Sequence, residues 1–109
     1  MPLFGSKPKK VYVLIYYRSN PPTSSQQAEI MSSLSKGGTS VVLAEVGQLS
    51  ADVQHAPAPL LEAYMKLQCS QYLMRNAIGI ASKKLDYTTK EVGGFVVTTM
   101  AGEFIGGSS

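Results

Sequence analysis

Apolar and polar positions alternate along the chain in a pattern that predicts two helices and three or four strands. Residues 10–18 (KVYVLIYYR) carry β-branched and aromatic side chains on both alternating faces, which is typical of a central strand. Asn20 and the two prolines after it end this strand. The T-x-x-Q spacing of Thr23 and Gln26 then matches a capping box, so a helix is expected to begin here. Four residues then follow at helical spacing, Gln27, Ile30, Met31 and Leu34, and the last three form a narrow apolar stripe.

The second half of the pattern predicts another strand and a long helix. Residues 39–46 (TSVVLAEV) indicate a strand that we expect to lie parallel to the first, and residues 48–59 form a loop with little periodicity. Residues 60–85 then show the longest helical pattern of the chain. Its apolar residues form two stripes. One contains Leu60, Tyr64, Leu67, Met74, Ile78, Ala81 and Leu85, and the other includes Met65, Cys69, Tyr72 and Leu73.

A polar connection, DYTTKEVGG, leads to a strand over residues 95–100 and a short last strand over residues 103–105. The order β-α-β-α-β, with one optional further strand, predicts an α/β fold, with α+β as the open alternative. We expect a two-layer sandwich of two helices on a three- to four-stranded sheet. Residues 11–105 are expected to form one domain between a flexible basic arm (1–10) and a flexible tail (106–109).

Composition adds limits rather than a function. The chain has 109 residues, of which 44% are hydrophobic and 16% charged, with a net charge of +3. These values fit one folded domain and indicate neither disorder nor a strongly basic surface. The longest wholly apolar run, Val11 to Tyr17, is too short for a transmembrane helix, and the N-terminus lacks the pattern of a secretory signal. The single cysteine, Cys69, excludes an intramolecular disulfide, so we expect a cytoplasmic protein.

The loop after the first strand offers one candidate ligand site. Arg18, Thr23, Ser24 and Ser25 would surround the N-terminus of the first helix, where unpaired N–H groups attract anions. This placement resembles the first loop of flavodoxin-like proteins, and the resemblance implies a small binder of a flavin or nucleotide phosphate. The loop contains no glycine, and helix capping also explains its hydroxyl groups. Capping is therefore the favoured interpretation, the phosphate site is an alternative, and no cofactor is otherwise indicated.

No pattern in the chain indicates a catalytic centre. Ser50, Asp52 and His55 supply the residue types of a hydrolytic triad, but the members of a triad usually come from separate elements. A lone histidine does not form a metal site, and Cys69 lies in an apolar helical pattern that favours a buried structural role. The sequence favours a non-catalytic protein and leaves enzymatic activity open.

A second alternative is nucleic-acid binding through the basic arm. Lys7, Lys9 and Lys10 lie close together near the N-terminus and could contact a phosphate backbone. The sequence contains no aromatic pair of the RNP type, no GXXG clamp and no helix-turn-helix signature. Nucleic acid is therefore a possible partner without a recognised binding motif.

The leading hypothesis comes from the breadth of apolar surface on the long helix. If one stripe covers the sheet, the second, with Met65, Cys69, Tyr72 and Leu73, needs another cover. A second copy of the chain or another protein subunit would supply it, and the open alternative is that the first helix covers this stripe within one chain. We therefore predict a protein interaction or assembly module whose interface includes these four residues.

Overall fold

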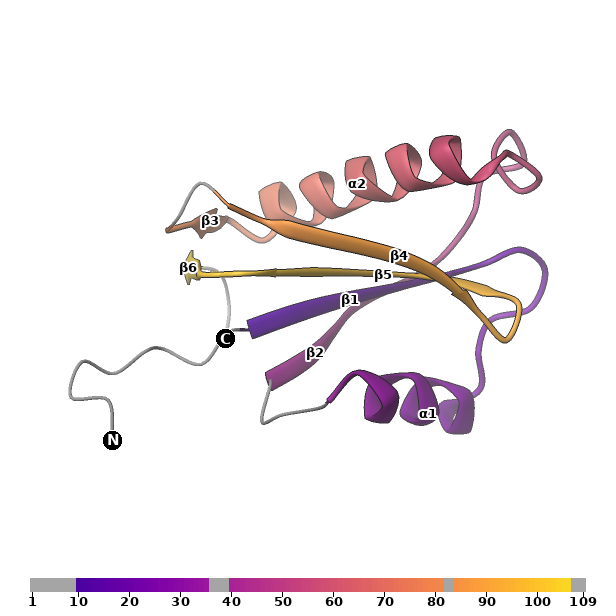
Figure 1. Ribbon diagram of the computed structural model, residues 1–109, viewed down its shortest axis with the longest axis horizontal. Helices are drawn as coiled ribbons and strands as arrows, with labels where there is room; N and C mark the ends of the chain where they lie inside the picture. The colour runs from indigo at the N-terminus through magenta and orange to yellow at the C-terminus, as the bar shows by residue number, and fades with distance from the viewer. Residues whose placement is uncertain (1–9, 36–39, 82–83, 107–109) are drawn as a thin grey trace.

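The computed structural model describes residues 10–35, 40–81 and 84–106, and its main element is a four-stranded sheet (Figure 1). The strand order is β2-β1-β5-β4, with β1 parallel to β2 and antiparallel to β5, and with β4 antiparallel to β5. A separate two-stranded antiparallel sheet is formed by β3 and β6. The bounds are β1 Lys10–Tyr17, α1 Ser24–Leu34, β2 Ser40–Gln48, α2 Ala58–Arg75, β3 Ile78–Ile80, β4 Asp86–Val92, β5 Phe95–Gly102 and β6 Phe104–Gly106.

The two helices lie on opposite faces of the main sheet (Figure 1). Side chains of a strand alternate between its faces, so β1 contributes Leu14 to the cluster under α2 and Val13 to the cluster under α1. Both of these side chains are fully buried, as expected for a central strand. Two helices packed on a small sheet are therefore confirmed. The expected two layers are in fact three, because α1 and α2 cover different faces.

The start of α1 confirms the predicted capping box. Thr23 accepts a hydrogen bond from the backbone N–H of Gln26 at 3.1 Å, and its own N–H donates to the Gln26 side chain at 2.8 Å. Ile30 is the buried residue of this helix and packs on the sheet. Gly37 and Gly38 follow this helix in the sequence and predict its end, but they lie outside the described residues.

The long helix is shorter than its sequence pattern predicts, because it ends at Arg75 rather than near Leu85. The Asn76 side chain donates a hydrogen bond to the Tyr72 carbonyl at 2.9 Å, and Ala77 follows with a positive φ of 54°, which a helix cannot continue through. The next residues form β3, which pairs with β6 instead. Apolar residues at positions 78 and 80 fit helical spacing by coincidence, which explains the wrong prediction.

The polar connection DYTTKEV is the edge strand β4, which the sequence did not predict. It joins β5 through a two-residue turn in which Gly93 and Gly94 have φ values of 57° and 88°, the left-handed conformation that favours glycine. Its side chains are exposed or half-buried, so they give a weak hydrophobic signal. The fourth strand of the sheet is thus polar because it lies at an edge.

At the ends of the described chain, Lys10 is the first residue of β1, as the strand predicted over residues 10–18 requires, and Gly106 belongs to β6, although the sequence analysis placed residue 106 in the tail. The rest of that arm and tail lies outside the described residues. No helix in the described ranges has the length and apolar character needed to span a membrane.

Candidate interaction surfaces

The face of α2 that packs on the sheet is the one that the sequence analysis expected to be uncovered. Met65, Cys69 and Leu73 are buried against the sheet, together with Leu61. Tyr72 is half-buried, with its ring 5.7 Å from the ring of Tyr12 on β1. These residues are part of the intramolecular core, so the prediction that they form an exposed stripe is wrong.

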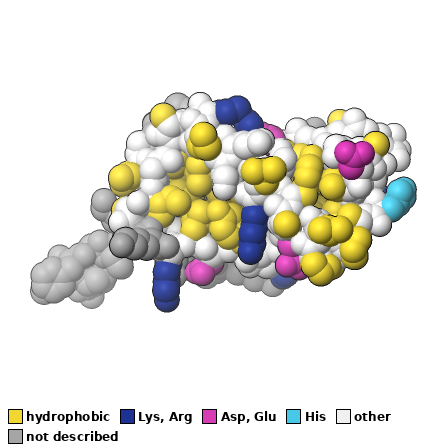
Figure 2. All heavy atoms as spheres, turned by 90° about the horizontal axis from the view of Figure 1, so that it is seen from above, with side chains coloured by type: hydrophobic (Ala, Val, Ile, Leu, Met, Phe, Trp, Pro, Cys, Tyr) yellow, Lys and Arg dark blue, Asp and Glu magenta, His cyan; other side chains and the backbone are white. Residues whose placement is uncertain are grey.

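The opposite face of α2 carries three large apolar side chains that point away from the sheet. Leu60, Leu67 and Met74 are 58%, 53% and 79% exposed. They are spaced seven residues apart, so they lie along one line of the helix. We call these three residues the outer stripe. Figure 2, which views this side of the molecule, shows hydrophobic side chains along the length of the face.

The apolar surface does not stop at the end of the helix. Ile80 of β3 and Ile105 of β6, in the small sheet that follows α2, are 40% and 52% exposed. Periodicity predicted two apolar stripes on this helix but could not tell which of them faces the sheet. Both stripes are apolar, and only the tertiary packing distinguishes them.

A layer of aromatic rings explains why one helix is enough to cover its face of the sheet. The rings of Tyr12 and Phe104 meet edge to face at 4.7 Å, and those of Tyr16 and Tyr64 at 6.1 Å. Aromatic side chains bury large areas and fill the space beside a single helix. The inner face of α2 is therefore covered within the chain, and the outer stripe is the apolar part of this helix that has no cover.

A polar network fixes α2 to the edge strand β2. The Tyr16 hydroxyl donates a hydrogen bond to the Glu45 carboxylate, which also forms an ion pair with Arg75 at the end of α2. Gln68 lies close to the same hydroxyl, at 3.3 Å. Burial and the hydrogen bond from Tyr16 to Glu45 raise the pKa of the Tyr16 hydroxyl, so it stays protonated at neutral pH. This network fastens α2 to β2.

The backbone of β2 is what brings Glu45 to this network. The register between β1 and β2 shifts between Val13 and Leu14, so that Leu14 pairs with Glu45. Such a bulge changes the direction of the side chains that follow it.

Cys69 lies in the core beneath α2. Burial, followed by the charge of Glu45, raises the pKa of its thiol to about 12. A buried, protonated thiol is unreactive.

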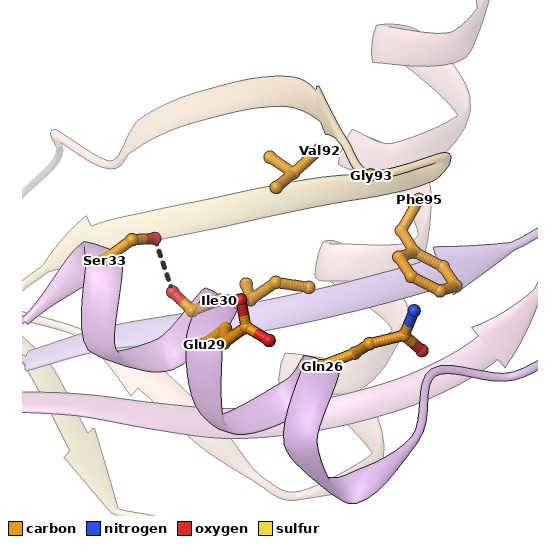
Figure 3. A pocket seen from close by; sticks show the side chains of 7 residues that line it. All are labelled: Gln26, Glu29, Ile30, Ser33, Val92, Gly93 and Phe95. Carbon is orange, nitrogen blue, oxygen red and sulfur yellow. Dashed lines mark hydrogen bonds between the residues drawn. The ribbon is translucent and has the colours of Figure 1, made fainter.

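On the other face of the sheet, α1 leaves a groove open beside the β4–β5 hairpin (Figure 3). Two neighbouring cavities of about 370 Å³ and about 250 Å³ share Ile30, Ser33 and Val92 and together form this groove. A helix is about 10 Å wide, and four strands about 4.8 Å apart are wider than that, so one short helix leaves part of the face uncovered. The other lining residues are Gln26, Glu29 and Leu34 of α1, with Thr88, Lys90, Gly93, Phe95, Val97 and Thr99 from the hairpin.

The sequence analysis missed this groove because one of its walls is β4, which was not predicted. Figure 3 shows Gln26 and Glu29 on the α1 side, with Val92 and Phe95 on the hairpin side. The floor includes the buried residues Ile30 and Phe95. The groove thus combines an apolar floor with polar walls.

Two of the four residues proposed for a phosphate site, Arg18 and Thr23, are engaged in other contacts. Thr23 caps α1, as described above, and Ser24 and Ser25 are exposed in its first turn. The guanidinium of Arg18 donates to the Gln54 carbonyl at 2.8 Å and forms an ion pair with Glu91 at 3.1 Å. The geometry of this loop is that of a capped helix.

The other residues considered in the sequence analysis are a possible triad, possible metal ligands and the basic arm. Ser50, Asp52 and His55 are all exposed in the loop between β2 and α2. Among the described residues, no group of three or more His, Cys, Asp or Glu side chains is arranged to hold a metal ion. Of the basic arm, Lys7 and Lys9 lie outside the described residues, and the Lys10 ammonium lies 5.5 Å from the centre of the Tyr12 ring.

Comparison with known proteins does not assign a function. No protein-family model, curated protein or solved structure matches this chain. Its function is therefore inferred from its own surfaces.

Proposed function

We propose that this protein is a non-catalytic assembly module that associates with further copies of itself through the outer stripe of α2. The observation that carries the proposal is the alignment of Leu60, Leu67 and Met74, each more than half exposed, on a helix whose inner face is already packed. Exposed apolar residues that occur singly are normal on folded proteins. Three of them in one line along a helix form the kind of surface that partner helices or grooves bury.

In this proposal the outer stripe takes the place of the interface expected from the sequence, whose residues pack in the core. Substituting Tyr72 or Leu73 would damage the core, so it would not test association. The outer stripe has no such role within the chain. The buried thiol of Cys69, the single cysteine, supports a reducing compartment, and we propose the cytoplasm as the place of assembly.

The test is the molar mass of the wild-type protein, measured by size-exclusion chromatography with light scattering over a range of concentrations. We expect a mass above that of one chain, increasing with concentration. Leu67→Glu places a charge in the centre of the stripe and is expected to reduce the mass to that of one chain. Because Leu67 is half exposed, the circular dichroism spectrum and the melting temperature of the dilute protein should stay close to those of the wild type.

Val46→Glu is the matched control. It introduces the same charge at another exposed apolar residue, on β2, away from the outer stripe. This variant should associate like the wild type. A wild-type protein that has the mass of one chain up to millimolar concentration, or a Leu67→Glu variant with unchanged mass, would contradict the proposal.

A further inference from the structure

We infer that the outer stripe of one copy docks into the groove between α1 and the β4–β5 hairpin of the next copy, so that assembly is head-to-tail. This inference rests on the proposed function and adds the acceptor surface. It differs from a symmetric contact between two outer stripes, in which the same residues of both copies would meet.

The first argument is that, in the described part of the chain, an exposed apolar stripe lies on one side of the sheet and a groove with an apolar floor lies on the other. The outer stripe is convex and lies on the α2 side, whereas the groove is concave and lies on the α1 side. A contact between two outer stripes would rest on three apolar side chains from each copy, and a stable interface requires on the order of 800 Å² per partner. A helix that enters a groove is contacted by the floor and both walls, which is a recurring mode of protein recognition.

The second argument is length. Leu67 is seven residues from both Leu60 and Met74, so neighbouring stripe residues are about 10.5 Å apart along the helix. On the hairpin side, the groove extends along β4 from Val92 to Thr88, about 13 Å at the rise of a strand. Two consecutive stripe residues therefore fit into the groove, which itself consists of two neighbouring cavities.

The third argument is charge at the rims. Glu29 lies on the α1 wall of the groove, and Lys66, the residue before Leu67, is exposed on the flank of α2, about 100° around the helix from Leu67. The Lys66 ammonium lies 5.6 Å from the centre of the Tyr87 ring on β4 of the same chain, so this charge lies at the edge of the α2 face. Opposite charges at the rims favour the correct orientation without contributing much free energy.

Docking in this way would place the α2 of one copy beside the α1 of the next, between the two sheets. Each face of a four-stranded sheet has room for about two helices, and the α1 face holds one. The docked helix would fill the second place. Because the stripe and the groove are different surfaces, each copy could receive one neighbour and dock into another.

The experiment uses variants of the full chain that each disable one surface. Val92→Glu places a charge in the groove, at a side chain that is 39% exposed. Ser33→Arg is a second groove variant that adds bulk on α1. The Ser33 hydroxyl donates within its own helix, to the Ile30 carbonyl at 2.8 Å, so the hydrogen bond lost on replacing it is one within α1 (Figure 3). Leu67→Glu disables the stripe.

Each variant alone is expected to have the mass of one chain in light scattering. A mixture of Leu67→Glu with Val92→Glu should form a complex of two chains, one of each kind. The intact stripe of the Val92→Glu copy docks into the intact groove of the Leu67→Glu copy, and the other two surfaces are disabled. The mixture of Leu67→Glu with Ser33→Arg should behave in the same way.

The outcomes separate the two proposals. If both groove variants keep the wild-type mass while Leu67→Glu is monomeric, the outer stripe associates but the groove is not its acceptor, and the inference is wrong. If all variants are monomeric and neither mixture forms a two-chain complex, the inference is also wrong. A monomeric wild-type protein overturns the proposed function and the inference with it.

Discussion

The hydroxyl of Tyr16, on the central strand β1, donates a hydrogen bond to the carboxylate of Glu45 on the neighbouring strand β2. Glu45 in turn binds Arg75, the last residue of α2. One carboxylate therefore connects the central strand, the edge strand and the helix that presents the outer stripe. The position of that stripe depends on a network whose members are far apart in the sequence.

Removing the Tyr16 hydroxyl should weaken this connection. Tyr16→Phe deletes a hydrogen bond to a charged group, and Glu45 is partly exposed to solvent, so we expect a loss of about 1–2 kcal/mol in the free energy of unfolding. Urea unfolding followed by circular dichroism measures the loss. Tyr17→Phe, a half-buried tyrosine on the same strand that packs against the α1 side, is the control and should change stability by less than about 0.5 kcal/mol. Equal losses for the two variants would show that the hydroxyl of Tyr16 contributes nothing.

Gly47 on β2 lies directly beside the Tyr16 ring, where a Cβ atom would be 2.9 Å from the ring carbon Cζ. Alanine normally stabilises the interior of a strand relative to glycine by about 0.5–1 kcal/mol. Here Gly47→Ala should destabilise instead, by about 1–3 kcal/mol, because the Tyr16 ring is held in place by Glu45 and cannot move freely.

The same urea experiment measures this sign reversal, and a second background tests its cause. In a Tyr16→Leu protein, where the ring is absent, Gly47→Ala should cost much less than in the wild type. An equal cost in both backgrounds would mean that something other than the ring opposes the methyl group. Gly47 therefore reports on the rigidity of the Tyr16 position.

The two stripes of α2 make opposite predictions for substitution by alanine. Met65 is fully buried, so Met65→Ala should cost about 2–5 kcal/mol through lost contacts and a cavity. Leu67 is half exposed, so Leu67→Ala should change the stability of the dilute protein by less than about 0.5 kcal/mol. Low concentration matters, because association through the stripe would stabilise the folded state. A larger loss in the free energy of unfolding for Leu67→Ala than for Met65→Ala would mean that the outer stripe, and not the inner face, packs on the sheet.

The assignment of the two stripes is also where prediction from sequence reached its limit. The apolar run in β1, the capping box at Thr23 and the parallel pairing of the first two strands are determined by local patterns, and the structure confirms them. Which stripe of α2 faces inward depends on the shape of the aromatic layer beneath it, which involves residues as distant as Tyr12 and Phe104. Local periodicity contains no information about that layer.

The candidate surfaces were harder to predict than the fold for a related reason. The groove requires β4, whose polar sequence at an open edge gives little hydrophobic alternation, although the two glycines at 93 and 94 are a hairpin signal. The early end of α2 depends on Asn76 and Ala77, whose turn competes with an apolar pattern that suits a longer helix. A reading that gave more weight to Gly-Gly and to Asn after a helix could have found both features.

The buried thiol makes stability depend on alkaline pH. The pKa of the Cys69 thiol is raised from 9.0 to about 12, because burial and then the charge of Glu45 disfavour the thiolate. Below pH 9.0 the thiol is protonated in both the folded and the unfolded chain, so its contribution is constant. Between pH 9.0 and about 12 the unfolded chain releases the proton and the folded chain does not, so the free energy of unfolding falls as pH rises.

This loss has a maximum slope of about 1.4 kcal/mol per pH unit for one group. Cys69→Ala should lower stability at neutral pH because it removes buried volume, but its free energy of unfolding should fall less steeply above pH 9.0 than that of the wild type. The measurement is a series of urea titrations at increasing pH. Tyr16, whose pKa is raised from 10.0 by burial and by its hydrogen bond to Glu45, adds a second decline at higher pH in both proteins. Identical slopes for the wild type and Cys69→Ala just above pH 9.0 would mean that the thiol is not protected by the core, and that the inner face of α2 opens to solvent.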